Sequence, residues 1–194
     1  MGVLDTIMCG KIIVYINEFK KNVSQFQISN WAKNKVVDYV NSIYRTEYKI
    51  DDIQRACFGK PFINNPYGVE FSISHSGNCV VVVIANNVIG VDLENVRAIE
   101  QYKFAKRFFT TREFAIYYES SNKECKFWEI WTKKEAYVKY LGAGISYGLK
   151  KFDVYDEKLI KKFFYRTIEN YVFSIFFAEE IDAKSIVINE NICT

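Results

Sequence analysis

The sequence has a single histidine, only two prolines, and five cysteines without any closely spaced pair. The single histidine, His75, excludes a serine-hydrolase triad of the usual form, because the adjacent Ser74 and Ser76 cannot reach the required geometry. The scattered, odd-numbered cysteines predict free thiols in a reducing compartment and show no zinc-ligand spacing. We therefore expect a cytoplasmic protein without disulfides and without a zinc site.

Long apolar runs and a strong net charge are also missing. The longest purely apolar run, residues 79–85, has the length of a strand and is far too short to span a bilayer. The net charge is only +3, with no dense basic stripe of the kind that nucleic-acid-binding proteins use. In contrast, 49% of the residues are hydrophobic and 17% are aromatic, which is enough for a packed interior. We expect a globular protein that binds neither nucleic acid nor a membrane.

Hydrophobic periodicity divides the chain into strands and helices. In the first part it predicts a strand over 12–16, a helix over 31–44, a strand over 71–74, and strands over 80–85 and 88–94 joined as a hairpin at Asn86-Asn87. In the second part it predicts a helical segment over 101–118, a long helix over 124–141 that ends at Gly142, and strands over 152–155, 163–168 and 171–178. We predict an α+β fold of two halves, residues 1–95 and 96–194, each with antiparallel strands and a helix.

Two acidic side chains share one face of the strand expected at residues 88–94. Side chains alternate along a strand, so Asp92 and Glu94 lie with Gly90 on the face opposite Val91 and Leu93. The two carboxylates would be roughly 7 Å apart, and hard cations such as Mg²⁺ take oxygen ligands from carboxylates and substrate phosphates. Taken alone, the pair is more simply explained as the solvated face of a strand, with a magnesium site as the alternative.

The long helix has a glutamate and a lysine at the edge of its apolar face. At about 100° per residue, Glu135 and Lys139 fall close to the direction of Trp128. The bland explanation is a surface ion pair. The functional explanation makes Glu135 a metal ligand or general base and lets Lys139 neutralise phosphate charge.

Two shorter motifs have groups suited to phosphate. In Ser74-His75-Ser76-Gly77, hydroxyls, an imidazole and the N–H groups of a turn would suit a phosphate, although a capped turn with an incidental histidine explains them as well. In Gly59-Lys60-Pro61 the lysine lies on a stiffened backbone, which suits a point charge directed at phosphate. Neither motif is specific on its own.

The combination of these motifs is specific. They occur in the order Gly59-Lys60-Pro61, Phe71 to Ser76, Ile89 to Glu94, Arg107-Phe108-Phe109 with Glu113, and Trp131 to Lys139. In this order and spacing the chain resembles the 4′-phosphopantetheinyl transferases, and among them the larger, surfactin-synthetase-activating type. The resemblance extends from about residue 59 to about residue 153.

This resemblance implies a monomer of two similar, pseudo-symmetric halves with the active site in the cleft between them. It implies an enzyme that transfers the 4′-phosphopantetheine moiety of coenzyme A to a serine of an acyl, peptidyl or aryl carrier protein and releases adenosine 3′,5′-bisphosphate. Such carriers serve secondary-metabolite, fatty-acid, polyketide or nonribosomal peptide biosynthesis. By resemblance, the Mg²⁺ on the coenzyme A pyrophosphate is coordinated by Asp92, Glu94 and Glu135.

The resemblance also implies roles for the other motif residues. With Asp92, the expected catalytic residues are Glu135, which accepts the serine proton directly or through a water, and Lys139, which contacts the phosphates. Glu113 matches an acidic position near the site. The basic N-terminal stretch usual in the larger type is short here, with Lys33 and Lys35 as its counterparts. Contacts to coenzyme A are expected from Lys60, Ser74, His75, Lys139 and Lys35.

An acidic carrier protein calls for a basic and apolar docking patch. A candidate patch consists of Lys103, Phe104, Lys106, Arg107, Phe108 and Arg112, unless Phe104 and Phe108 are core residues at helical spacing. Two other functions fit part of the pattern: a metal-dependent pyrophosphate hydrolase with water as acceptor, and a non-catalytic protein that binds coenzyme A or a carrier. The motif from Trp131 to Lys139 favours the transferase over the hydrolase, and the intact acidic residues disfavour the binding protein.

Overall fold

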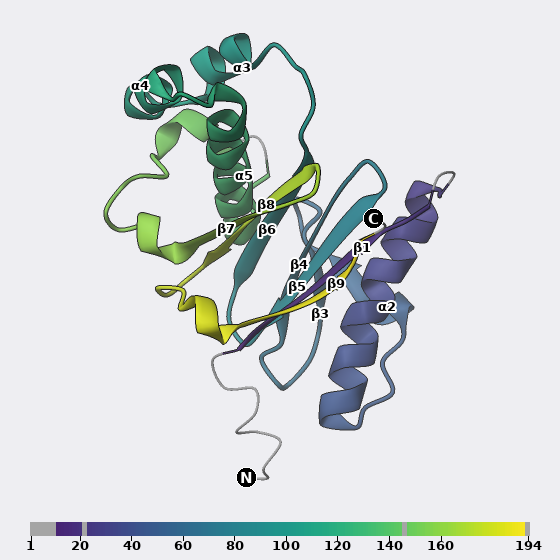
Figure 1. Cartoon of the computed structure of the whole chain (residues 1–194). Helices are drawn as coiled ribbons and strands as arrows, with labels where there is room; N and C mark the ends of the chain where they lie inside the picture. The colour runs from purple at the N-terminus through teal and green to yellow at the C-terminus, as the bar shows by residue number, and fades with distance from the viewer. Residues whose placement is uncertain (1–10, 21–22, 145–146, 193–194) are drawn as a thin grey trace.

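The computed structural model describes residues 11–20, 23–144 and 147–192 (Figure 1). Its strands are β1 (Ile12–Glu18), β2 (Ile53–Arg55), β3 (Pro61–Ile63), β4 (Glu70–Ser76), β5 (Cys79–Ala85), β6 (Ile89–Asn95), β7 (Phe163–Ile168), β8 (Tyr171–Phe177) and β9 (Ile186–Asn191). Its α-helices are α2 (Gln25–Tyr44), α3 (Gln101–Phe108), α4 (Thr111–Glu119) and α5 (Lys123–Leu141), and short 3₁₀ helices lie at Ile50–Asp52, Leu149–Lys151, Ile160–Lys162 and Ala183–Ser185. The predicted α+β class is confirmed.

Two sheets pack face to face between α2 and α5 (Figure 1). The first sheet has the order β4-β5-β1-β9, with β9 parallel to β1 and the other neighbours antiparallel. The second has the order β6-β8-β7 and is antiparallel throughout, while β2 and β3 form a separate short pair. Helix α2 covers the outer face of the first sheet, and α5 packs against β6 and β8.

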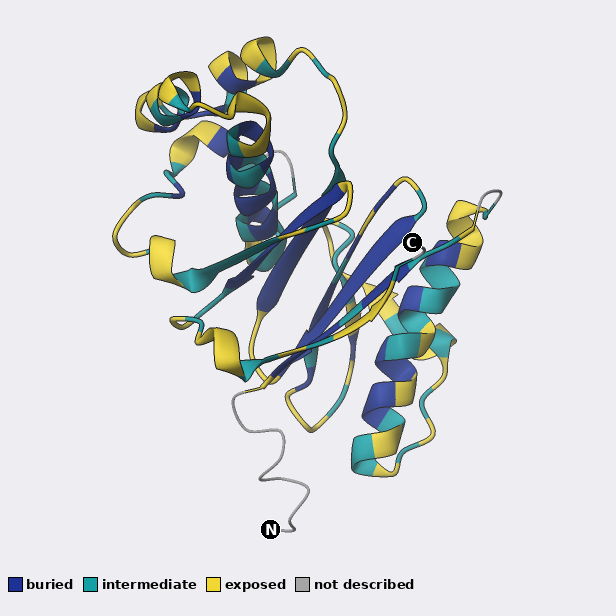
Figure 2. Cartoon of the chain, in the orientation of Figure 1, coloured by how far each residue is buried: buried dark blue, intermediate teal, exposed yellow. Residues whose placement is uncertain are grey.

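Strand β5 shows how the sequence builds these layers. Alternate side chains point to opposite faces, so Val80, Val82 and Ile84 pack toward α2. Val81 and Val83 instead join the core between the two sheets. The strand is therefore buried along its whole length (Figure 2), as its unbroken apolar sequence predicts.

The hairpin predicted at Asn86-Asn87 is wrong. Strand β5 pairs with β4 and β1, whereas β6 pairs along its whole length with β8, from Ile89 opposite Phe177 to Asn95 opposite Tyr171. The asparagine turn thus leads from one sheet into the other. A local turn signal predicts a reversal of the chain but not which strand the returning segment will pair with.

Other elements differ from the prediction in where they begin or divide, in two cases at a residue whose side chain hydrogen-bonds to the backbone as an N-cap. Helix α2 begins at Gln25, earlier than predicted, because Ser24 and Gln27 form a capping box. The predicted helical segment 101–118 is two helices, α3 and α4, with Thr110 as the N-cap of the second. The strand predicted at 152–155 is absent among the described residues. Strand β9 was not predicted at all.

The two sheets do not follow the predicted division at residue 95. Strand β6 ends at this residue, yet it belongs to the sheet of β7 and β8, and β9 returns to pair with β1. Each sheet therefore includes a strand from the other side of residue 95, and the division into halves there stays a prediction. In the part of the chain that the structure describes, no helix is long and apolar enough to cross a membrane.

Strand β6 and helix α5 approach each other closely at Gly90. A Cβ atom at this position would lie 2.1 Å from the carbonyl oxygen of Ala136 and 2.4 Å from the backbone nitrogen of Tyr140. Both contacts are to the main chain of α5, so only glycine allows this approach. The close approach holds the middle and end of α5 against the strand on which Asp92 and Glu94 lie.

Candidate active site

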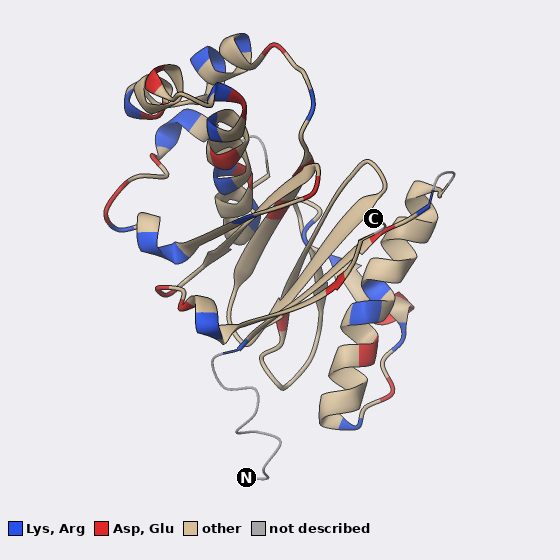
Figure 3. Ribbon diagram, viewed as in Figure 1, with Lys and Arg blue, Asp and Glu red and all other residues tan. Residues whose placement is uncertain are grey.

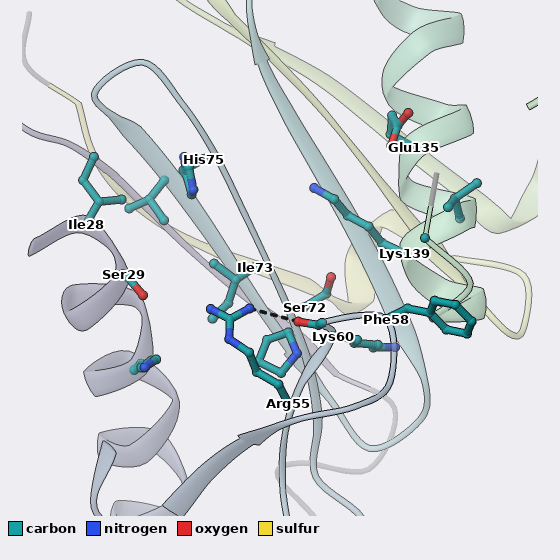
Figure 4. Close-up of a pocket in the computed structure, with 17 residues that line it drawn as sticks. Ile28, Ser29, Arg55, Phe58, Lys60, Ser72, Ile73, His75, Glu135 and Lys139 are labelled. Atoms are coloured by element: carbon teal, nitrogen blue, oxygen red, sulfur yellow. Dashed lines mark hydrogen bonds between the residues drawn. The ribbon is translucent and has the colours of Figure 1, made fainter. Parts of the chain in front are cut away.

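A half-open cavity of about 360 Å³ lies between α2, the turn before β3, strand β4 and the end of α5 (Figure 4). Its wall contains five basic side chains and the carboxylate of Glu135. Positive charges around a concave, partly desolvated site attract phosphate groups. The basic side chains are Lys33, Arg55, Lys60, His75 and Lys139.

Three serines of β4 face β6, although the two strands belong to different sheets. The hydroxyl oxygens of Ser72, Ser74 and Ser76 accept the backbone N–H groups of Val91, Leu93 and Asn95, each at 3.1 Å. The hydroxyls thus replace the missing backbone ladder between the two strands. Ser74 Oγ and Ser76 Oγ also donate to the side chains of Asp92 and Glu94, at 3.1 Å and 2.9 Å.

Asp92 is buried and only one of its oxygens is satisfied. Its Oδ1 atom accepts from Lys139 Nζ at 2.7 Å and from Ser74 Oγ at 3.1 Å. Its Oδ2 atom is buried and has no hydrogen-bond partner among the described residues. An orphaned carboxylate oxygen is costly, and a bound cation would satisfy it.

Glu94 and Glu135 complete an acidic cluster with Asp92. Burial, together with the charge of Asp92, raises the pKa of Glu94, and the neighbouring Ser76, Trp131 and Arg97 oppose this shift. Burial raises the pKa of Glu135 to about 7, with further contributions from the charges of Asp92 and Glu94 and an opposing one from Lys139. The carboxylates therefore repel one another, which a cation between them would relieve.

The chemistry of this cluster fits Mg²⁺. Carboxylate oxygens are the ligands that Mg²⁺ prefers, and Asp92 has a free one. However, no three acidic, cysteine or histidine side chains of the described residues already form a ligand group. The orphaned oxygen of Asp92 and the mutual repulsion of the carboxylates still fit a cation, and the ammonium of Lys139 is the positive charge that Asp92 contacts in the structure.

The structure thus brings together Asp92, Glu94, Ser74 and Lys139. Glu135 lies close enough for the charges of Asp92, Glu94 and Lys139 to shift its pKa. Lys139 also donates to Ser74 at 2.7 Å and lines the cavity, so it joins the acidic cluster to the basic wall (Figure 4). Trp131 is the residue of this cluster whose influence on the pKa of Glu94 the sequence reasoning missed. Its place one helical turn before Glu135 was the available signal.

Of the residues predicted to contact coenzyme A, Lys60, His75 and Lys139 line the cavity, whereas Ser74 and Lys35 do not. Ser74 faces the carboxylates, whereas His75 points from the other side of β4 into the cavity (Figure 4), where desolvation and the charge of Lys139 lower its pKa. The ammonium of Lys60 donates to the carbonyls of Ile89 and Tyr140, at 3.2 Å and 3.5 Å. Lys60 therefore lines the cavity with its charge directed at main-chain oxygens near the end of α5.

On α2, Lys33 lines the cavity and Lys35 does not. The ammonium of Lys35 instead lies 5.4 Å from the ring centre of Trp31 and 5.8 Å from that of Tyr15. Two residues along a helix differ by about 200° in direction, so only one of these lysines can face the cavity. Arg55, which sequence reasoning did not single out, also lines the cavity and donates to the Gly59 carbonyl at 3.0 Å.

Glu113 lies outside this site, in a fully buried ion pair with Lys134 at 2.8 Å. Its carboxylate accepts the N–H groups of Thr110 and Val154, and Lys134 donates to the carbonyls of Leu149 and Phe152. Burial raises the pKa of Glu113 and lowers that of Lys134, and the ion pair opposes both shifts. The strand predicted at 152–155 is absent from these described residues, and the ion pair attaches this segment to α4 and α5 through the hydrogen bonds to its backbone.

We expect Glu113→Gln to lower the free energy of unfolding by about 3 kcal/mol, because removing one partner of a buried ion pair typically costs about 3–5 kcal/mol. The variant leaves the buried Lys134 ammonium without its ion-pair partner, although the charge of Asp153 still acts on it. Urea unfolding of the two proteins measures the difference. Glu119→Gln, at an exposed position of the same helix, should change little. An activity loss without a stability loss would contradict the structural role.

Comparisons with known proteins match these features to one family. A profile of the 4′-phosphopantetheinyl transferase superfamily matches residues 88–188. The chain is 32% identical over 161 residues to the 4′-phosphopantetheinyl transferase gsp of Aneurinibacillus migulanus. This alignment covers 70% of this chain and 66% of the relative. The chain is 32% identical over 121 residues to 4′-phosphopantetheinyl transferase Sfp of Bacillus subtilis, with 59% of this chain and 54% of the relative covered. It is 35% identical over 96 residues to 4′-phosphopantetheinyl transferase psf-1 of Bacillus pumilus, with 48% and 41% covered. The matches thus span between 41% and 66% of the length of these relatives.

Proposed function

The chain belongs to the 4′-phosphopantetheinyl transferase superfamily, and we propose that it transfers the 4′-phosphopantetheine moiety of coenzyme A to a serine of an apo carrier protein. The proposed reaction depends on Mg²⁺ and releases adenosine 3′,5′-bisphosphate. The observation that supports it most is Lys139, which lies between a basic cavity and a cluster of carboxylates. A pyrophosphate linking a nucleotide to a reactive arm needs both kinds of group side by side.

The metal would be held by Asp92, Glu94 and Glu135. Bound there, Mg²⁺ supplies Lewis-acid polarisation of the pyrophosphate and neutralises its charge. The basic wall of the cavity binds the nucleotide phosphates, with Lys33, Arg55 and His75 as the groups that face the space. Lys60 holds the turn of this wall against the end of α5 through its two carbonyl contacts.

In the proposed transfer, the carrier serine Oγ forms a bond to the β-phosphorus, and the bond from that phosphorus to the bridging oxygen breaks. Adenosine 3′,5′-bisphosphate leaves with the bonding electrons, and Lys139 contacts the phosphates as charge develops. Glu135, whose pKa in the protein alone is about 7, accepts the serine proton directly or through a water. If Glu135 held the metal, its pKa would be lower, and a bridging water would be the proton acceptor.

The test is incubation of the protein with coenzyme A, Mg²⁺ and a panel of apo carrier domains, followed by mass spectrometry of each carrier. Gain of one phosphopantetheine on at least one carrier supports the transferase. Release of nucleotide without carrier labelling would instead support a pyrophosphate hydrolase. Binding of coenzyme A with neither product would support a non-catalytic protein.

Helix α3 offers the proposed docking surface for the carrier. Lys103 and Lys106 are exposed on it, and Phe104 is 41% exposed. Figure 3 shows α3 with basic positions in blue. The ring of Phe104 contacts those of Phe108 and Trp131, and Trp131 lies near enough to Glu94 to lower its pKa. Phe108 is half-buried against the core, so the core alternative describes Phe108 better than Phe104. The patch is thus continuous with the carboxylate cluster.

Reversing the charge at both lysines, Lys103→Glu with Lys106→Glu, is expected to raise the KM for the carrier by about fivefold. Exposed charges at an interface mainly steer association, at roughly 0.2–1 kcal/mol each. The KM for coenzyme A should stay unchanged, because neither lysine lines the cavity. Steady-state kinetics with each substrate varied in turn measures both constants. The matched control reverses Lys158 and Lys184, which are exposed elsewhere, and an equal effect there would contradict the patch.

A further inference from the structure

The three serines of β4 repeat one hydrogen-bond pattern at a period of two residues. Each hydroxyl accepts the N–H of the residue 19 positions later, in Val91, Leu93 or Asn95. At two of the three positions the hydroxyl also donates to the side chain of the residue before that N–H. These acceptors are Asp92 for Ser74 and Glu94 for Ser76. At the third position, Ser72, the corresponding residue is Gly90, which has no side chain to orient.

A serine hydroxyl has one proton and two lone pairs. In Ser74 all three are used, because Oγ accepts from Leu93 N–H and Lys139 Nζ and donates to Asp92 Oδ1. Once the backbone N–H fixes the position of the oxygen, the proton has a defined direction toward the carboxylate. The hydroxyl thus binds one oxygen of the carboxylate and leaves the other, Asp92 Oδ2, without a protein partner.

Ser76 orients Glu94 in the same way. Its hydroxyl donates to Glu94 Oε2 at 2.9 Å and accepts the N–H of Asn95 at 3.1 Å. Ser76 is only 8% exposed, so water competes little for this bond. The Glu94 carboxylate of β6 is therefore held by a strand that belongs to the other sheet.

We propose that Ser74 and Ser76 are positioning residues that orient Asp92 and Glu94 to bind a divalent cation, with the backbone of β6 as their common template. The inference rests on the proposed role of these carboxylates as Mg²⁺ ligands. Partners that hydrogen-bond to a metal ligand fix its orientation, and their loss typically lowers metal affinity about 10–100-fold. Ser72 accepts the same kind of backbone N–H but has no carboxylate to orient. It is therefore the control that distinguishes positioning of a metal ligand from simple cross-linking of the two strands.

The experiment compares Ser76→Ala with Ser72→Ala. Both variants lose one hydroxyl and leave one backbone N–H of β6 without its partner, so a similar lowering of Tm is expected. Mn²⁺ is titrated into each protein without coenzyme A, and free Mn²⁺ is measured by electron paramagnetic resonance. We expect the Kd for Mn²⁺ to rise about tenfold in Ser76→Ala, and to stay within about twofold of the wild type in Ser72→Ala. Ser76→Thr, which keeps the hydroxyl, should restore most of the affinity.

Equal weakening in both alanine variants would overturn the inference, because the serines would then act only by holding the strands together. Unchanged affinity in Ser76→Ala, or a wild type that binds no Mn²⁺, would overturn it as well. Ser74→Ala is not the main test because that serine also contacts Lys139. The carrier-labelling assay is separate: if it fails while the two variants still differ in Mn²⁺ affinity, the proposed function fails and the positioning role stands.

Discussion

Asp92→Asn is expected to slow carrier modification by about 10³-fold or more while leaving the fold intact. The substitution keeps the size of the side chain but removes the charge next to which the metal would bind. A metal ion supplies several kcal/mol of transition-state stabilisation, and each 1.36 kcal/mol corresponds to about a factor of ten in rate. Asp92 Oδ2 is already buried without a partner, so the native carboxylate is costly to the fold. The substitution also removes the charge that pairs with the partly exposed Lys139, so the two effects oppose each other and we expect the Tm of the variant to stay close to that of the wild type.

Single-turnover labelling of an apo carrier, followed by mass spectrometry, measures the effect. The same variant should lose measurable Mn²⁺ binding, which ties the loss of rate to the metal. Asp38→Asn, at an exposed position of α2, is the matched control and should keep the wild-type rate. A rate for Asp92→Asn within tenfold of the wild type would contradict the assignment of Asp92 as a metal ligand.

Gly90→Ala is expected to lower the free energy of unfolding by more than about 4 kcal/mol, among the largest effects of single substitutions. At a position with an ordinary backbone conformation, replacing glycine by alanine stabilises by about 0.4–1 kcal/mol, because it restricts the unfolded chain. Here the added Cβ would lie 2.1 Å from Ala136 O and 2.4 Å from Tyr140 N. The strand and the helix would have to separate, and the carboxylates of β6 would move away from Glu135.

Denaturant unfolding, with the protein level in the soluble fraction as a second readout, tests this prediction. Because the contacts are to main-chain atoms of α5, adding Ala136→Gly should not rescue the variant. Rescue by that second substitution would show that the close contact involves the Ala136 side chain instead. A Gly90→Ala protein as stable as the wild type would contradict the described packing of β6 on α5.

Local patterns predicted most of the elements because their causes are local. The long helix ends where Gly142 takes a positive φ, and β5 is buried because its run of valine and isoleucine has no polar face. Strand β9 escaped prediction because three of its six residues are polar and its partner, β1, lies far away in the sequence. For the same reason, the turn at Asn86-Asn87 could not show that β6 would pair with β8.

For the site, the sequence was sufficient to name the acidic cluster but not the contacts of each side chain. The alternation of Asp92 and Glu94 along one strand predicted that they share a face, and both do meet serines of β4. The chemistry of lysine alone could not show that Lys60 donates to two carbonyls, or that Lys33 rather than Lys35 lines the cavity. Those contacts depend on which atoms of elements distant in the sequence lie within hydrogen-bond distance of each lysine, or border the cavity with it.

The pairing of β1 with β9 also determines when the first sheet can be completed during protein synthesis. Residues 12–17 pair with residues 186–191, so β1 keeps one open edge until almost the whole described chain has left the ribosome. An open strand edge is a template for pairing with other chains, and pairings between residues so distant in sequence form slowly. The nascent chain is therefore exposed to aggregation through this edge until β9 emerges, and slow translation of the segment before β9 would prolong that interval.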